Sequence, residues 1–307
     1  QVKVTVITPN VDCIDLPEWI DRKEVSLSAR EVFGFKDIYP LVRTRDVLKE
    51  IDQDFDIVAL SNPDIFFTPD FYNKVANIVS TGTDSVNIHR ETIPDADGLI
   101  APIEAIQGET LIHEGSDCFI FSPQDAKDFE TGNTVVGMSP VDDIILLNMS
   151  LQNESFIRLK GKRLTFHFGD ERAWKSDARN PYFPQSFHLG KRAAAELIKR
   201  NGPENVFNSA IRAELFYDTW RHVILPAMFP FQSEKFYRYW SYRIRNKTFP
   251  VDELFQRIIE DQFRSGLRYF LNERLRNFLN ERLAIPLIKL IRQTNIRKRY
   301  FLYRSRA

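Results

Sequence analysis

A short polar segment interrupts an apolar stretch at residues 57–67, whose sequence is IVALSNPDIFF. The apolar residues before it predict a buried strand, and Asn62 and Asp64 follow where that strand ends. Polar groups at a strand end can face a ligand, because the sheet fixes their positions. An alternative interpretation is that Asp64 is an ordinary turn or helix-capping residue.

An acidic pair, Asp142 and Asp143, precedes the apolar run at 144–151, which predicts a helix. The helix dipole favours ionised carboxylates at this end, whereas repulsion between neighbouring acids raises one of the two pKa values. A carboxylate so placed can take a proton from a hydroxyl group. Alternatively, Asp142 caps the helix and Asp143 is solvated in its first turn.

The elements that would position these residues alternate along the chain. Apolar runs predict strands at residues 2–8, 55–60, 85–89, 118–121 and 164–168. Helical spacing predicts helices at 41–51, 71–78 and 144–151, and one that starts at Ser122-Pro123; Thr68 and Pro69 suit the cap and first turn of the second helix. Such alternation predicts an α/β fold with a mainly parallel sheet flanked by helices.

Four segments resemble, in the same order, parts of glycosyltransferases with the GT-A fold. Residues 57–67 resemble the acidic-X-acidic segment, and HEGSDCFIF at 113–121 resembles the strand that lines the acceptor side of the sugar site. GMSPVDD at 137–143 resembles the segment with the acidic catalytic residue. FHFGD at 166–170, with Trp174 after it, resembles the His-bearing terminal strand. The resemblance covers about residues 1–180 and implies a Rossmann-like, GT-A-like catalytic domain at 1–190.

The resemblance also implies a divalent cation, Mn²⁺ or Mg²⁺, with Asp64 and His167 as its ligands. The chain departs from the family at Asn62, which stands at the first acidic position. An amide oxygen can bind a cation or a ribose hydroxyl but brings no charge, so Asn62 is a cofactor-binding candidate that weakens the metal site. His167 has an alternative role as a partly buried structural histidine.

Three acidic residues are candidates for catalysis. The resemblance points to Asp143 as the base that deprotonates the acceptor hydroxyl, with Asp142 beside it. Asp117 lies just ahead of a predicted buried strand and is a further candidate, or it hydrogen-bonds sugar or acceptor hydroxyls. The resemblance places the loop Thr8-Pro9-Asn10 beside the nucleotide base and ribose.

Four further residues have an ordinary interpretation beside the functional one. His113 is equally well explained as a loop histidine, and Trp174 either stacks on a sugar or packs in the core. Arg43 and Arg45 could contact a diphosphate, although arginines on a helix face are more often solvated.

The function implied is transfer of a sugar from a nucleotide-diphosphate sugar, UDP- or GDP-linked, to a hydroxyl of a glycan or lipid-linked glycan. Inversion at the sugar carbon is favoured, and the product belongs to a surface polysaccharide or glycoconjugate. The alternative is a catalytically inactive GT-A-like module that binds a glycan or a protein partner, which the departure at Asn62 would fit.

The composition excludes several other classes of protein. An apolar fraction of 43 % is typical of a folded globular protein. The 12 glycines form neither a P-loop nor a dinucleotide fingerprint, and no Gly-X-Ser-X-Gly elbow occurs. These absences disfavour kinases, NTPases, dehydrogenases and serine hydrolases.

The charge of the chain is divided unevenly. Residues 231–307 hold 18 Lys and Arg against 7 Asp and Glu, while the whole chain has zero net charge. Basic and aromatic residues on the amphipathic helices predicted within 191–307 would suit the surface of a membrane, or they pack as a helical bundle. Nucleic acid is a less favoured partner, because the rest of the chain is acidic.

The expected location is the cytoplasm, with peripheral contact at the inner face of a membrane. The longest apolar stretch, 223–231, is broken by two prolines and is too short to span a bilayer. We expect no signal peptide, since the first residues alternate like a strand. Cys13 and Cys118 are too few for a disulfide framework or a four-ligand zinc site.

Overall fold

The structure is a computed structural model, and it describes residues 2–9, 16–36, 38–93, 110–112, 116–168, 181–202 and 235. The chain divides into two compact units, residues 1–197 with 222–224 and residues 198–221 with 225–307. Most of the predicted C-terminal region, 191–307, lies outside the described residues. The first unit holds nearly all of the described residues.

The described residues form ten strands and six helices. The strands are β1 (Thr5–Thr8), β2 (Asp21–Glu24), β3 (Val58–Ser61), β4 (Phe66–Phe67), β5 (Ser85–Ile88), β6 (Glu91–Ile93), β7 (Leu111–Ile112), β8 (Cys118–Phe121), β9 (Phe156–Leu159) and β10 (Thr165–Phe168). The helices are α1 (Ala29–Phe33), α2 (Thr44–Lys49), α3 (Phe71–Ser80), α4 (Pro123–Asp128), α5 (Val141–Gln152) and α7 (Tyr182–Asn201). The predicted α/β class is thereby confirmed, and every predicted strand and helix up to residue 168 has a counterpart.

Strands of the described part are grouped into three sheets. The central sheet has the order β3-β8-β5-β9, a second has the order β4-β10-β6-β7, and β1 pairs in parallel with β2. Only His89 and Arg90 separate β5 from β6, so the chain passes directly from the central sheet into the second one. The loops at that junction are therefore close to both sheets.

The prediction of a mainly parallel sheet is wrong. In the central sheet β8 runs antiparallel to both β3 and β5, and only β5 and β9 are parallel. In the second sheet β10 is parallel to β6, while β4 and β7 are antiparallel to their neighbours. A parallel neighbour needs a crossover connection. Here the chain instead reverses between β6 and β7, and β8 returns against the direction of β5.

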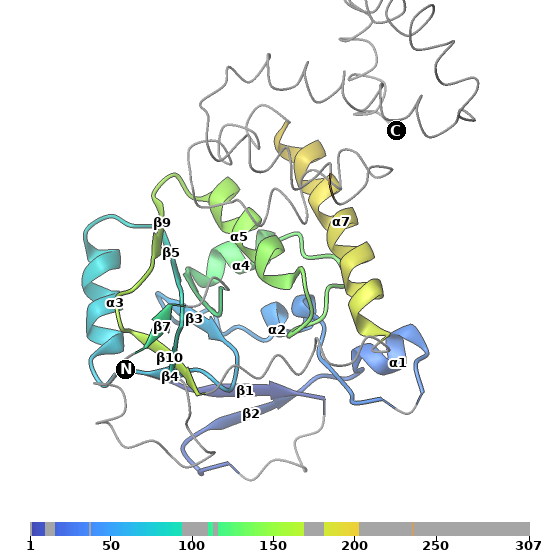
Figure 1. Ribbon diagram of the computed structural model, residues 1–307, viewed down its shortest axis with the longest axis horizontal. Helices are drawn as coiled ribbons and strands as arrows, with labels where there is room; N and C mark the ends of the chain where they lie inside the picture. Colours follow the sequence, from blue (N-terminus) through green and yellow to red (C-terminus); the bar gives the residue numbers. More distant parts are fainter. Residues whose placement is uncertain are drawn as a thin grey trace, which may run out of the picture. The chain divides into compact units, whose positions relative to one another are not determined.

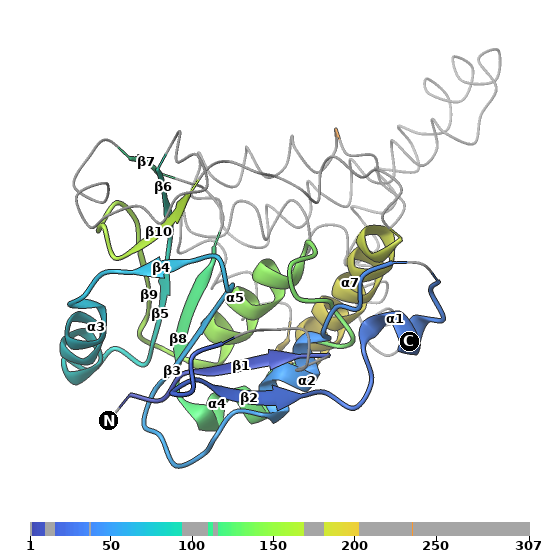
Figure 2. The ribbon, with the colours of Figure 1, turned by 90° about the horizontal axis from the view of Figure 1, so that it is seen from below.

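Helices cover both faces of the central sheet. In Figures 1 and 2, α3 lies on one face, and α4 and α5 lie on the other. On the α3 side, Phe71 and Val75 pack against alternate residues of two strands, Val86 and Ile88 of β5 and Cys118 and Ile120 of β8. Because alternate residues of a strand point to opposite faces, Asn87 of β5 faces away from that apolar cluster.

Local sequence explains several helix starts. Ser28 and Glu31 form a capping box at α1, and Ser122 and Asp125 form one at α4, where Pro123 is the first helical residue. The predicted Ser-Pro start of α4 is thus confirmed. At α3 the N-cap is Asp70 and not Thr68, so Thr68 and Pro69 lie ahead of the helix.

The start of α5 depends on a close contact with α7. Pro140 is the N-cap of α5, which makes Asp142 and Asp143 the second and third helical residues. A Cβ atom on Gly190 of α7 would lie 2.4 Å from Cγ of Pro140, so only glycine allows this approach. The alternative in which Asp142 caps the helix is wrong, because the cap lies two residues earlier.

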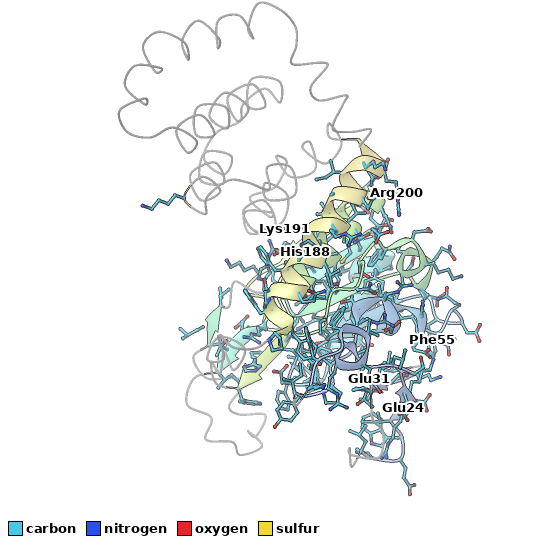
Figure 3. All side chains as sticks on the ribbon, turned by 90° about the vertical axis from the view of Figure 1, so that its right-hand side faces the viewer. Glu24, Glu31, Phe55, His188, Lys191 and Arg200 are labelled. Carbon is cyan, nitrogen blue, oxygen red and sulfur yellow. The ribbon has the colours of Figure 1, made fainter. Side chains whose placement is uncertain are left out.

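Helix α7 is the longest of the described helices and packs by one side. Its buried residues include Ser186, Gly190, Ala193, Ala194 and Leu197. Figure 3 shows His188, Lys191 and Arg200 on the same helix. Within the described part of the chain, no helix is both long enough and apolar enough to cross a membrane.

Candidate functional site

The end of β3 brings Asn62 to Asp117. Ser61 pairs with Cys118 at the end of the antiparallel β3–β8 ladder. Asn62, which follows Ser61, therefore lies opposite Asp117, which precedes Cys118. The side-chain amide of Asn62 donates a hydrogen bond through Nδ2 to Oδ1 of Asp117, over 3.2 Å. The backbone N–H of Ile65 donates to the carbonyl of Asn62, which closes a turn around Asp64.

The same turn brings Asp64 to His167. Phe66 of β4 pairs with Phe166 of β10 in an antiparallel ladder, so His167 comes opposite Ile65, the residue that follows Asp64. Oδ2 of Asp64 and Nε2 of His167 lie 3.1 Å apart. The His167 side chain is only 8 % exposed, whereas that of Asp64 is 58 % exposed. The two residues named as metal ligands are thus neighbours, and one is open to solvent.

Asp117 also contacts Arg90, which sequence reasoning missed. Nε of Arg90 lies 3.3 Å from Oδ2 of Asp117, and the two side chains are 11 % and 9 % exposed. Burial raises the pKa of Asp117, the positive charge of Arg90 opposes that rise, and the nearby Asp64 adds to it. The sequence signal for Arg90 is weak, because Arg90 is a single arginine two residues after the end of β5.

A buried amide supports the segment that carries Asp117. Oδ1 of Asn87 accepts hydrogen bonds from Nε of Arg158 at 2.9 Å and from Oγ of Ser116 at 3.2 Å. Nδ2 of Asn87 donates to the carbonyl of Cys118, and a terminal nitrogen of Arg158 donates to Oγ of Ser116. Asn87 therefore ties β9 to the residues on both sides of Asp117. The sequence signal for Asn87 was that a polar residue stands in the middle of a predicted buried strand.

The acidic pair at the start of α5 belongs to the same electrostatic cluster. Burial raises the pKa of Asp142 well above its ordinary value, and the charges of Asp117 and Asp143 raise it further. Arg90 acts in the opposite direction. A carboxyl group whose proton is held more tightly than usual is suited to exchange a proton with a hydroxyl. Asp142, Asp143 and Asp117 are thereby electrostatically linked, as are Asp64 and Asp117.

The nucleotide-loop residues are only partly described. Ile7 of β1, next to Thr8, packs in the same apolar cluster as Leu60 of β3, two residues before Asn62. This packing places the end of β1, with Thr8 and Pro9, near the end of β3. Asn10, like His113 and Trp174, lies outside the described residues.

The two arginines of α2 have structural explanations. Nε of Arg43 forms an ion pair of 2.6 Å with Asp46, and its Nη1 donates to Asn133. Arg45 is exposed on the helix. The ordinary interpretation of a solvated arginine thus fits Arg45, whereas Arg43, the N-cap of α2, is mostly buried and paired with Asp46.

The donor set bears on how a cation could be held. Among the described residues, no group of three or more His, Cys, Asp or Glu side chains is arranged to hold a metal ion. Asp64 and His167 supply one carboxylate and one imidazole. Mg²⁺ and Mn²⁺ sites that rely on few protein ligands complete their coordination with phosphate oxygens and water. The pair therefore fits a cation that arrives with a diphosphate, not a resident ion in a full protein cage.

Comparison of the chain with models of protein families, with curated proteins and with solved structures found no match.

Proposed function

We propose that the chain is a glycosyltransferase that takes its sugar from a nucleotide-diphosphate sugar. The observation that carries this proposal is the meeting of four segments far apart in sequence. Asn62 contacts Asp117, Asp64 contacts His167, and Asp142 interacts electrostatically with Asp117. Each of the four segments that resemble the GT-A family contributes at least one of these residues.

Within this proposal the cluster has two kinds of task. Asp64 and His167 would hold Mn²⁺ or Mg²⁺ together with the diphosphate of the donor. When bound, the cation offsets the negative charge that develops on the departing diphosphate. Asp143 takes the proton of the acceptor hydroxyl as that oxygen bonds to the sugar carbon and the bond to the diphosphate breaks. Asp142, whose pKa is raised, is the second candidate for that base.

The acceptor and the location extend the proposal. A glycan or lipid-linked glycan at the inner face of a membrane would fit the basic and aromatic region 231–307. All of that region except Lys235 lies outside the described residues.

The proposal is tested by thermal denaturation of the full chain with UDP-, GDP-, CMP- and dTDP-sugars, each with and without Mn²⁺. A ligand that binds only the folded state stabilises it by about 2.7 kcal/mol at a hundred times its Kd. We expect one nucleotide sugar to raise Tm, most strongly with Mn²⁺. Asp64→Ala should remove the Mn²⁺-dependent part of the shift.

Slow hydrolysis of the same donor provides the activity readout. We expect release of the nucleoside diphosphate, and a loss of transfer but not of donor binding in Asp143→Asn. A chain that binds none of the donors would contradict the proposal and favour the glycan- or partner-binding module. Binding without Mn²⁺ would retain the transferase and remove Asp64 and His167 from its mechanism.

A further inference from the structure

Both carboxylate oxygens of Asp117 are engaged by the protein itself. Oδ1 accepts the hydrogen bond from Nδ2 of Asn62, and Oδ2 faces the guanidinium of Arg90. The side chain is almost completely buried. Oδ2 and Nε of Arg90 attract each other by charge without forming a hydrogen bond, whereas Oδ1 is held by the hydrogen bond from Asn62.

The chemistry of the pair fixes which end of the Asn62 amide faces Asp117. An ionised carboxylate only accepts hydrogen bonds, so the amide must present its NH₂ group. Burial raises the pKa of Asp117, and the positive charge of Arg90 opposes that rise. In the structure, Nδ2 of Asn62 is the amide atom that lies 3.2 Å from Oδ1 of Asp117.

We infer that Asn62 is a positioning residue, a hydrogen-bond donor that joins Asp117 to the turn carrying Asp64, and that position 62 requires an amide. The departure from the acidic-X-acidic pattern is then a requirement of this site.

The position of Asp64 follows from this contact. The turn that begins at Asn62 is closed by the Ile65 N–H, so fixing the Asn62 side chain fixes the loop between β3 and β4. A continuous series of contacts then runs from Arg90 through Asp117 and Asn62 to the Asp64–His167 pair.

The surrounding charges explain why an acid at position 62 would be unfavourable. Asp117 is approached by Arg90 after β5, by Asp64 after β3, by His167 of β10 and by Asp142 of α5, which itself interacts with Asp143. Four carboxylates thus share one arginine and one histidine. A carboxylate at position 62 would replace a donated hydrogen bond of 3.2 Å by a contact between two like charges.

The test compares four variants of the full chain by thermal denaturation at neutral pH without ligand. Asn62→Asp should lower Tm by roughly 5–10 °C, because two carboxylates then face each other in a buried site. Asn62→Ala is the matched control, which removes the hydrogen bond without adding a charge, and should lower Tm by only roughly 2–4 °C. The double variant Asn62→Asp with Asp117→Asn exchanges the two groups and restores a donor–acceptor pair.

The double variant is measured against Asp117→Asn alone, because both proteins lack the Arg90–Asp117 ion pair. We expect Asn62→Asp to lower Tm by several degrees less in the Asp117→Asn background than in the starting protein, because no like charge then stands at position 117. The inference is overturned if Asn62→Asp is as stable as the starting protein, or if it lowers Tm as much in the Asp117→Asn background as in the starting protein.

A second measurement rests on the proposed function. Mn²⁺ is titrated into the chain in the presence of the nucleoside diphosphate selected by the thermal panel, and its binding is measured. If position 62 were a metal site, the added carboxylate of Asn62→Asp would tighten Mn²⁺ binding, and that result would overturn the inference. We expect weaker or unchanged binding. If no variant binds Mn²⁺, the metal proposal fails, while the melting temperatures still decide the role of Asn62.

Discussion

The two ends of the site each pair an aspartate with a nitrogen-bearing side chain, in different surroundings. Arg90 and Asp117 lie 3.3 Å apart with both side chains about one-tenth exposed, whereas Asp64, 3.1 Å from His167, is 58 % exposed. Charges removed from water interact more strongly, and a buried charge that loses its partner is costly. Losing a partner therefore costs more at the buried end, while the exposed end can change partners and receive a ligand.

The largest effect should come from removing the cation of the buried end. Arg90→Met leaves Asp117 buried with a single hydrogen-bond donor, and we expect the free energy of unfolding to fall by about 3–5 kcal/mol. Urea denaturation measures this loss. Arg45→Met, an exposed arginine on α2, is the control and should stay within about 0.5 kcal/mol of the starting protein. A loss below about 1 kcal/mol for Arg90→Met would remove the distinction between the two ends.

A smaller effect of opposite sign is expected at Asp142. Its pKa is raised in the folded state, mainly by burial, so the stability present below pH 4 is lost as pH rises through the folded-state pKa. Asp142→Asn removes that loss and should stabilise the chain by about 0.5–2 kcal/mol at neutral pH, a gain typical of replaced active-site groups.

The pH dependence provides the check for this variant. Denaturation of both proteins from pH 4 to 8 should show the gain shrinking toward pH 4, where Asp142 is protonated in the starting protein. Asp56→Asn, an exposed aspartate, should show no such trend. A gain that is constant with pH would indicate a packing effect instead.

The smallest effect on stability is expected at the exposed end. Asp64→Ala should change the free energy of unfolding by less than about 1 kcal/mol, because exposed ion pairs contribute little. His167→Ala removes a buried ring from β10 and should cost more. If Asp64→Ala destabilised the chain as much as Arg90→Met, Asp64 would be part of the structural framework and a poor candidate for ligand binding.

Much of the fold could be predicted because local apolar patterns specify strands and helices. The predicted strand 118–121 coincides with β8, and the strand 164–168 contains β10. Strand β2 has the sequence DRKE, without apolar residues, and could not be found, because it forms by backbone pairing with β1. The direction of each strand could not be predicted either, since it depends on where the chain reverses.

The site was predictable where its polar residues flank predicted strands or where the resemblance pointed to them. Asn62 and Asp64 follow a predicted strand, Asp117 precedes one, and His167 was named from the resemblance; the structure brings them together. Arg90 and Arg158 were missed, because a single arginine after or within a strand looks like a solvated charge until its partners are known. Their importance depends on burial.

By itself, the sequence determined the strands and helices that carry an apolar pattern and the polar groups beside them, because apolar periodicity acts over a few neighbouring residues. Only the tertiary structure decided that β8 runs antiparallel, that Arg90 faces Asp117, and that Asn62 donates to the same carboxylate. Pairing and burial join residues far apart in the chain. The charge state and orientation of a side chain follow from those distant neighbours.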